Sequence, residues 1–193
     1  MSARVVSTRL VTARAALLAA LALAACGGGE DPIAGPGGGN VSLDEFPRAG
    51  AGGDPRGSYT PNEPLVAFFN VPTGISIDLT RNRGAGTITV SGASAESGTI
   101  TATGVTLEVV GTVRTPLGAI PLDAEDFSPL PEGSGTVAWR AIAGNRLVVT
   151  SSQDPAPDTL EYARTARGLF LIQREDVVPG LPPLAAVIAL RNR

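Results

Sequence analysis

The chain has 193 residues, of which 43% are hydrophobic, and this length suits one ordinary domain with extensions. The modest formal net charge of −3 gives no electrostatic reason to expect nucleic acid as a partner. With no histidine and one cysteine, the chain lacks an internal disulfide, catalytic triads that use an imidazole, and the usual ligands of zinc and copper. We therefore expect no cofactor and no metal.

The first 25 residues have the three-part layout of a secretory signal peptide. Arg4, Arg9 and Arg14 form a positive region, and residues 15–25 form an uncharged apolar run just before Cys26. This run is too short for a membrane-spanning helix, which needs about 20 residues. The sequence therefore predicts an exported protein from which residues 1–25 are removed.

The residues Leu23-Ala24-Ala25-Cys26 resemble the lipobox, the processing site of bacterial lipoproteins. The resemblance covers residues 1–26 only. It implies cleavage before Cys26 and lipid attachment to the Cys26 thiol, where two or three acyl chains give stable anchoring. Gly27 replaces the Asp that tends to retain such proteins in the inner membrane, so the outer membrane is favoured. Losing three arginines moves the net charge to about −6, and anionic headgroups would repel the mature domain.

Residues 26–61 have the composition of a flexible tether, because Gly, Pro, Ala, Asp and Ser dominate and large apolar side chains are few. The alternative is that part of this segment packs on the domain. Its likeliest docking point is then the apolar group of Val41, Leu43 and Phe46. We predict the lipidated cysteine and tether over residues 26–61 and a β domain over residues 62–193.

The region 62–193 is expected to be nearly all β, since runs rich in Val, Ile, Leu and Thr alternate with Gly, Pro, Asn and Asp. No segment in it keeps a helical period over eleven or more residues. The predicted strands lie near residues 64–70, 74–80, 86–92, 98–113 with a break, 134–143, 146–152, 158–165, 168–174 and 184–191.

Three hairpins are predicted from turn signals. The first turns at Gly144-Asn145, which would pair Ile142 with Leu147 and Trp139 with Thr150. The second turns over residues 165–168 and the third over residues 94–97. The third contains a short repeat, because the sequence Gly-Thr-Ile-Thr begins at residue 86 and again at residue 98. We interpret the two copies as the two arms of one hairpin, with a β-solenoid as the alternative.

The expected fold is all-β, an antiparallel meander of about 8–9 strands. Short sequential connections favour a small up-and-down barrel like that of the lipocalins, and a β-sandwich is the alternative. An eight-stranded barrel of this size is able to hold one small ligand.

Few residues remain as candidates for a functional site. Trp139 and Tyr162 would line a pocket in a ligand barrel, although isolated aromatics on patterned strands are more often core. The acidic cluster Asp123, Glu125 and Asp126 offers carboxylate or calcium chemistry, but its Pro-rich surroundings indicate a solvated loop. We identify no catalytic residue and no metal ligand, and Trp139 and Tyr162 are the candidates for ligand binding.

The leading hypothesis is a non-enzymatic lipoprotein that presents a small β domain for binding or interaction in the cell envelope. Its partners would be the membrane, through the anchor, and an envelope protein or a small apolar ligand. The alternatives are a lipocalin-like carrier of an apolar ligand and, less favoured, a carboxylate-based hydrolase.

Overall fold

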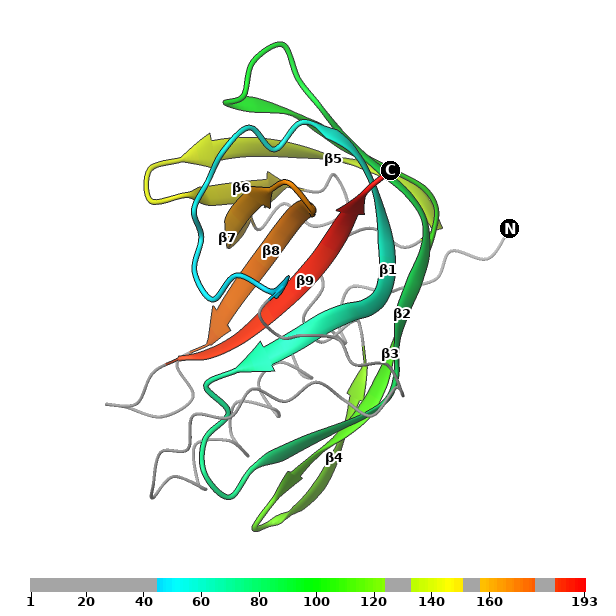
Figure 1. The fold of residues 1–193 in the computed structure, drawn as a ribbon, viewed down its shortest axis with the longest axis vertical. Coiled ribbons are helices and arrows are strands. Elements are labelled where there is room, and N and C mark those ends of the chain that lie inside the picture. Colours follow the sequence, from blue (N-terminus) through cyan, green and yellow to red (C-terminus); the bar gives the residue numbers. More distant parts are fainter. Residues whose placement is uncertain (1–44, 124–132, 151–156, 176–182) are drawn as a thin grey trace.

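The computed structural model describes residues 45–123, 133–150, 157–175 and 183–193. These residues form nine β-strands and no α-helix (Figure 1). The strands are β1 (Gly57–Phe69), β2 (Ser76–Ser91), β3 (Ser97–Thr115), β4 (Gly118–Asp123), β5 (Gly133–Ile142), β6 (Arg146–Thr150), β7 (Asp158–Thr165), β8 (Gly168–Glu175) and β9 (Leu184–Asn192).

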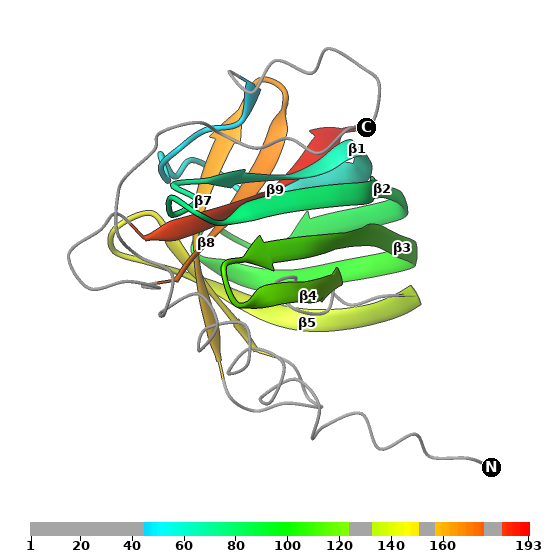
Figure 2. The same ribbon diagram turned by 90° about the horizontal axis from the view of Figure 1, so that it is seen from below.

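Eight of these strands close into an antiparallel barrel, which confirms the predicted up-and-down meander. The sheet order is β2-β1-β9-β8-β7-β6-β5-β3-β4, and pairing of β2 with β3 closes the ring (Figures 1 and 2). The ninth strand, β4, pairs only with the second half of β3. Because the sheet is closed, the sandwich alternative is wrong. The repeated Gly-Thr-Ile-Thr segments lie on paired strands, with Thr89 opposite Thr101, so they are arms of one hairpin and not turns of a solenoid.

Two segments that were predicted as separate strands form one continuous strand in the structure, and one observed strand was not predicted. The segments 74–80 and 86–92 belong to β2, whose middle is polar and glycine-containing and therefore has the composition of a turn. In the structure that middle pairs with β3, and the Arg83 guanidinium lies 2.7 Å from the Glu108 carboxylate. The unpredicted strand is β4, where Pro121 suggested a loop. Proline is tolerated there because β4 lies at an edge of the sheet.

The β5–β6 hairpin exists, but its predicted register is wrong by one residue. Ile142 pairs with Arg146 and Trp139 pairs with Val149, so the loop contains three residues and not two. Gly144 and Asn145 within it both have positive φ, at 79° and 55°. The observed register turns Leu147 and Val149 to the same face as Trp139, whereas the predicted one would have buried Thr150. The β7–β8 hairpin pairs Thr165 with Gly168, as predicted.

The main hydrophobic core lies inside the barrel and takes side chains from every strand. A second, smaller cluster lies on the outer face of β1, β8 and β9. Strand β9 serves both, since Ala186 and Ile188 belong to the main core and Ala185 and Val187 to the outer cluster. A strand buried on both faces is a continuous apolar run rather than an alternating one, and the sequence LAAVIAL has this character.

Strand β1 leaves β2 soon after it begins. Pairing with β2 covers Gly57–Tyr59, and β1 then bends and continues along β9. The Asn82 side chain occupies the place where the ladder would have continued. Its Oδ1 accepts hydrogen bonds from the amides of Leu65 (3.1 Å) and Val66 (2.8 Å), and its Nδ2 donates to the Val66 carbonyl (2.8 Å). Beyond this point β2, β3 and β4 extend the sheet past the barrel (Figure 1).

Candidate functional site at the capped end of the barrel

One end of the barrel is covered by the segment that precedes β1. Residues 45–56, called the strap below, run over β7 and β8 and then turn across the barrel end into β1. Gly52 pairs with Ala163 as a parallel bridge, in which the Gly52 amide donates to the Tyr162 carbonyl and the Arg164 amide donates to the Gly52 carbonyl. The folded part therefore begins before residue 62. The predicted tether boundary at residue 61 is too late, because residues 45–61 pack on or within the barrel.

Two glycines make the turn of the strap possible. Gly52 and Gly53 have φ of +68° and +105°, a region that residues with a Cβ avoid. A Cβ on Gly52 would also lie 2.5 Å from Oδ1 of Asn145, whose Nδ2 donates to the Gly50 carbonyl at 3.0 Å. The glycine-rich composition that suggested a coil is thus required by a specific turn.

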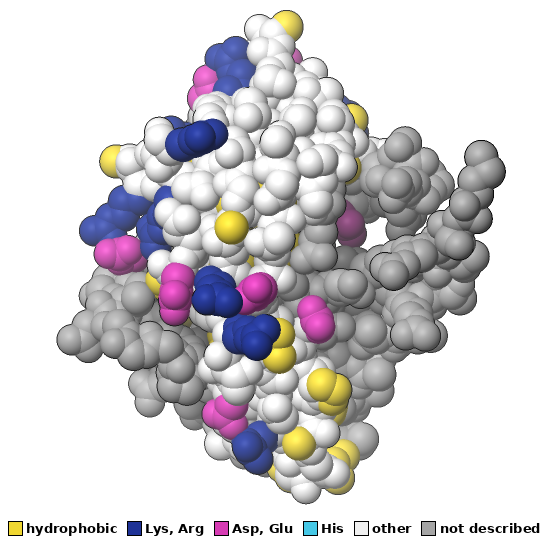
Figure 3. Space-filling view, turned by 90° about the vertical axis from the view of Figure 1, so that its right-hand side faces the viewer, with side chains coloured by type: hydrophobic (Ala, Val, Ile, Leu, Met, Phe, Trp, Pro, Cys, Tyr) yellow, Lys and Arg dark blue, Asp and Glu magenta, His cyan; other side chains and the backbone are white. Residues whose placement is uncertain are grey.

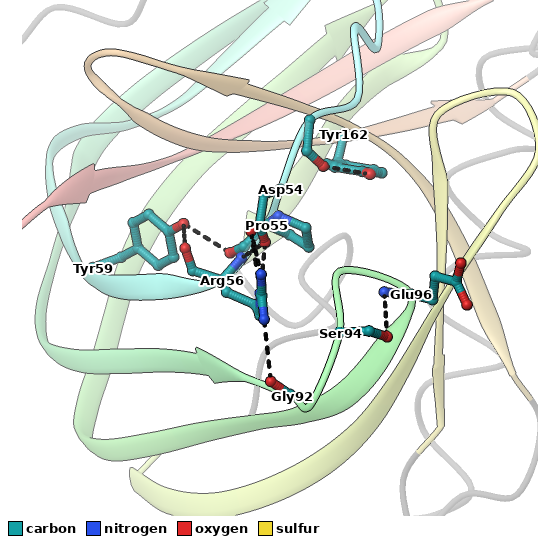
Figure 4. Close-up of polar contacts among 9 residues, drawn as sticks. Asp54, Pro55, Arg56, Tyr59, Gly92, Ser94, Glu96 and Tyr162 are labelled. Carbon is teal, nitrogen blue, oxygen red and sulfur yellow. Dashed lines mark hydrogen bonds and ion pairs between the residues drawn. The ribbon is translucent and has the colours of Figure 1, made fainter.

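Two buried tyrosines hold the strap against the barrel end. The Tyr59 hydroxyl donates to the Pro55 carbonyl at 2.7 Å, and the Tyr162 hydroxyl donates to the Gly53 carbonyl at 2.9 Å. Burial raises the pKa of both phenols, so both remain donors at neutral pH. Figure 4 shows Asp54, Pro55 and Arg56 lying between Tyr59 and the turn that carries Gly92 and Ser94.

An ion pair completes the cap on its outer side. The Arg56 guanidinium binds both carboxylate oxygens of Asp54, with contacts between 2.7 and 3.1 Å, and reaches the Gly92 carbonyl at 3.4 Å (Figure 4). These hydrogen bonds lower the pKa of Asp54 from 3.8 to about 2. Asp54 is therefore fixed as a carboxylate, which suits a structural ion pair and not a proton donor.

The outer part of the strap is anchored by an aromatic ring and by carboxylate–arginine contacts. Phe46 is only 3% exposed and meets Phe170 edge-on, with ring centroids 5.9 Å apart. Glu45 pairs with Arg167 at 2.6 Å and with Arg191 at 3.2 Å. The expected docking role of Phe46 is therefore observed. Val41 and Leu43 lie outside the described residues.

A second anchor of the strap is the pair of Glu161 and Arg174. The guanidinium lies 2.8 Å from the carboxylate and also donates to the Arg48 carbonyl, and the carboxylate accepts the Gly50 amide at 3.1 Å. The hydrogen bond from Arg174 lowers the pKa of Glu161. Asp54 and Glu161 are thus both held ionised by a neighbouring arginine.

Beside the cap lies an open hollow of about 360 Å³. It is bounded by the turn between β2 and β3 and by the hairpin of β5 and β6. Its lining residues are Glu96, Ser97, Arg140, Ala141, Ile142 and Ala143. Figure 4 shows the Glu96 side chain projecting toward the β5–β6 side, away from Asp54 and Arg56. The hollow combines one acid, one base, one hydroxyl and three aliphatic side chains.

The two predicted aromatic candidates are both part of the main core. Trp139 is 2% exposed and its Nε1 donates to the Ser91 carbonyl at 3.1 Å. Tyr162 is 6% exposed and holds the cap, as described above. Both therefore brace the capped end, as the core alternative expected. Of the other candidates, Cys26, Glu125 and Asp126 lie outside the described residues, and Asp123 is the exposed last residue of β4.

The surface of the described residues offers little else. Only Val110 and Leu117 are large, exposed hydrophobic residues among those described. Figure 3 shows the side of the molecule on the right of Figure 1, where acidic and basic side chains alternate and hydrophobic ones are scattered. Within the described ranges, no group of three acidic side chains is placed to hold a metal ion. No helix of the described chain is long and apolar enough to cross a membrane.

Comparison with protein-family models, curated proteins and solved structures found no match to this chain. The fold and the capped end are thus the basis for functional argument. Sequence reasoning missed Glu96, Arg140, Asp54 and Arg56. The alternation of β5 indicates that Arg140 faces outward, but only the pairing of β3 with β5, which are not consecutive strands, reveals that Glu96 lies beside it.

Proposed function

We propose that this protein is a bacterial lipoprotein, anchored to the outer membrane through lipid on Cys26, whose barrel is a non-enzymatic binding module of the cell envelope. The proposed cellular location is supported by the signal-peptide layout and by the lipobox-like residues that end at Cys26. The tether in this proposal lies before residue 45, because residues from Glu45 onward contact the barrel.

The observation that carries the binding role is the sealed end of the barrel. The strap closes it, the Tyr59 and Tyr162 hydroxyls hold the strap, and the main core packs beneath. Among the described residues, the strap and the core side chains cover this end, so recognition is expected at the outer surface. The arginine-bound carboxylates Asp54 and Glu161 favour a structural role for the acidic groups here, which supports a non-enzymatic module.

A lipocalin-like carrier of a small apolar ligand is the second candidate. It is favoured by closure of the barrel with eight strands and by its apolar interior, since barrels of this size are able to hold one small ligand.

Native mass spectrometry of the protein released from its own membranes by mild detergent tests both candidates. The proposal predicts a complex with an envelope component that dissociates when the outer surface is mutated. A stoichiometric apolar molecule retained within the barrel would favour the carrier instead. A chain that is found only free and unliganded, and that crosslinks to no envelope component, would contradict the binding role.

A further inference from the structure

The hollow between the β2–β3 turn and the β5–β6 hairpin contains two opposite charges that do not pair with each other. Glu96 and Arg140 both line it, yet no ion pair joins them. Its volume of about 360 Å³ falls within the range of small-molecule sites. The hollow is therefore large enough for a ligand that bridges both charges.

Neither charge is engaged elsewhere in the described chain. The Glu96 carboxylate and the Arg140 guanidinium make no hydrogen bond or ion pair with the residues that the structure describes. By contrast, the nearby groups are occupied: Arg56 binds Asp54, Arg174 binds Glu161 and Arg146 donates to the Ala143 carbonyl. Two unoccupied charges facing one hollow are thus an exception at this end of the barrel.

The backbone around the hollow is held in place by hydrogen bonds. The Ala141 amide donates to the Glu96 carbonyl at 2.7 Å, and the Glu96 amide donates to the Ser94 hydroxyl at 3.2 Å. Ser97 and Arg140 are directly paired residues of β3 and β5. The charged side chains therefore project from a backbone that is already held in place. Binding of a ligand would fix only the rotamers of these side chains.

We propose that this hollow binds a short zwitterionic peptide with small aliphatic side chains. The Arg140 guanidinium receives the terminal carboxylate, for which its planar fork is suited, and the Glu96 carboxylate receives the terminal ammonium. Ala141, Ile142 and Ala143 contact the aliphatic side chains, and the Ser97 hydroxyl is available to the peptide unit. This inference rests on the proposed function, because it names a ligand class for the binding module.

The test is an NMR titration of the full chain in detergent with the dipeptide Ala-Ala. Saturable shifts are expected at residues 96–97 and 140–143. N-acetyl-Ala-Ala lacks the ammonium and Ala-Ala amide lacks the carboxylate, so each should bind at least about tenfold more weakly. Glu96→Gln should abolish the preference for Ala-Ala over its N-acetyl form, and Arg140→Gln should abolish the preference over the amide.

Arg81→Gln is the matched control, because Arg81 is an exposed residue of β2 that does not line the hollow. It should leave the affinity unchanged, and the spectrum of each variant establishes that it is folded. Absence of saturable shifts in the wild-type protein, or binding that neither blocked peptide nor either variant weakens, would overturn the inference. Either outcome would still leave the proposals of membrane anchoring and of an envelope complex in place, because those proposals are tested by other measurements.

Discussion

Tyr59 illustrates how one residue links the core of this protein to its covering strap. Its ring is fully buried, its hydroxyl donates to the Pro55 carbonyl at 2.7 Å, and the Arg164 guanidinium lies over its ring at 5.3 Å from the centroid. Tyr162 makes the equivalent contact with Gly53, so the two phenols together hold both sides of Asp54.

Removing the Tyr59 hydroxyl should destabilise the protein. Tyr59→Phe leaves the Pro55 carbonyl without this donor, and the expected loss in the free energy of unfolding is about 1–2 kcal/mol. Urea unfolding of both proteins provides the measurement. Thr103→Val, at an exposed position, is the control and should change the free energy by less than about 0.5 kcal/mol. Equal stability of Tyr59→Phe and wild type would argue that the cap contributes nothing.

Gly52 and Gly104 form a matched pair, because both have positive φ, at 68° and 58°. Alanine at either position incurs the cost of a left-handed conformation, about 1–2 kcal/mol. At Gly52 the new Cβ also lies 2.5 Å from Asn145 Oδ1, whereas at Gly104 nothing lies within 4 Å. Gly52→Ala should therefore be the more destabilising in thermal unfolding. The reverse order would mean that the strap is not held as described.

Asp54 predicts a specific pH dependence. Its folded pKa of about 2 is below the ordinary value of 3.8, so its ion pair stabilises the fold above pH 4. That contribution declines as the pH falls from about 4 towards 2, because the unfolded chain takes up the proton near pH 3.8 whereas the folded protein does so only near pH 2. The melting temperature of wild type should exceed that of Asp54→Asn at neutral pH and converge with it near pH 2. A constant difference across this range would assign the effect to something other than the charge.

At the scale of elements, the strands were the most predictable feature, because apolar alternation and turn residues report directly on a sheet with one buried face. Packing of the strap was expected only as an alternative, because its glycines and prolines have the composition of a coil, and contacts distant in sequence, such as the bridge between Gly52 and Ala163, distinguish it from one. The register of the β5–β6 hairpin was wrong because Gly144-Asn145 has the signature of a two-residue turn. Which residues become neighbours in the sheet, such as Glu96 and Arg140, depends on the pairing of β3 with β5, which are not consecutive in sequence, and has no local signal.

Asn82 provides a test of how β1 separates from β2. Its side chain makes three hydrogen bonds to the backbone of Leu65 and Val66, so Asn82→Ala leaves those groups without their partner. The expected loss is about 2–3 kcal/mol, together with faster hydrogen exchange of the Leu65 and Val66 amides. Arg81→Ala, one residue earlier and exposed, is the control. Unchanged exchange at both amides would contradict the role given to Asn82.

At the scale of the whole molecule, the closed barrel and the strap divide the protein into a sealed end and an opposite end where β2, β3 and β4 extend the sheet. The fold class followed from the sequence because sequential hairpins leave few closed arrangements. The candidate site did not, because it is formed by a turn, a hairpin and a strap far apart in sequence. Neither the fold class nor the candidate site alone defines the function. The proposed location in the cell envelope depends on the residues before the strap.

The central claim is that Cys26 carries lipid and begins the mature chain. Intact-mass measurement of the protein in the membrane fraction of its own cells tests this most directly, with Cys26→Ser as the comparison. We predict the mass of residues 26–193 plus that of the attached lipid for the wild type, and loss of both processing and membrane association for Cys26→Ser. A wild-type chain that retains residues 1–25, or a Cys26→Ser protein that stays in the membrane fraction, would contradict the account.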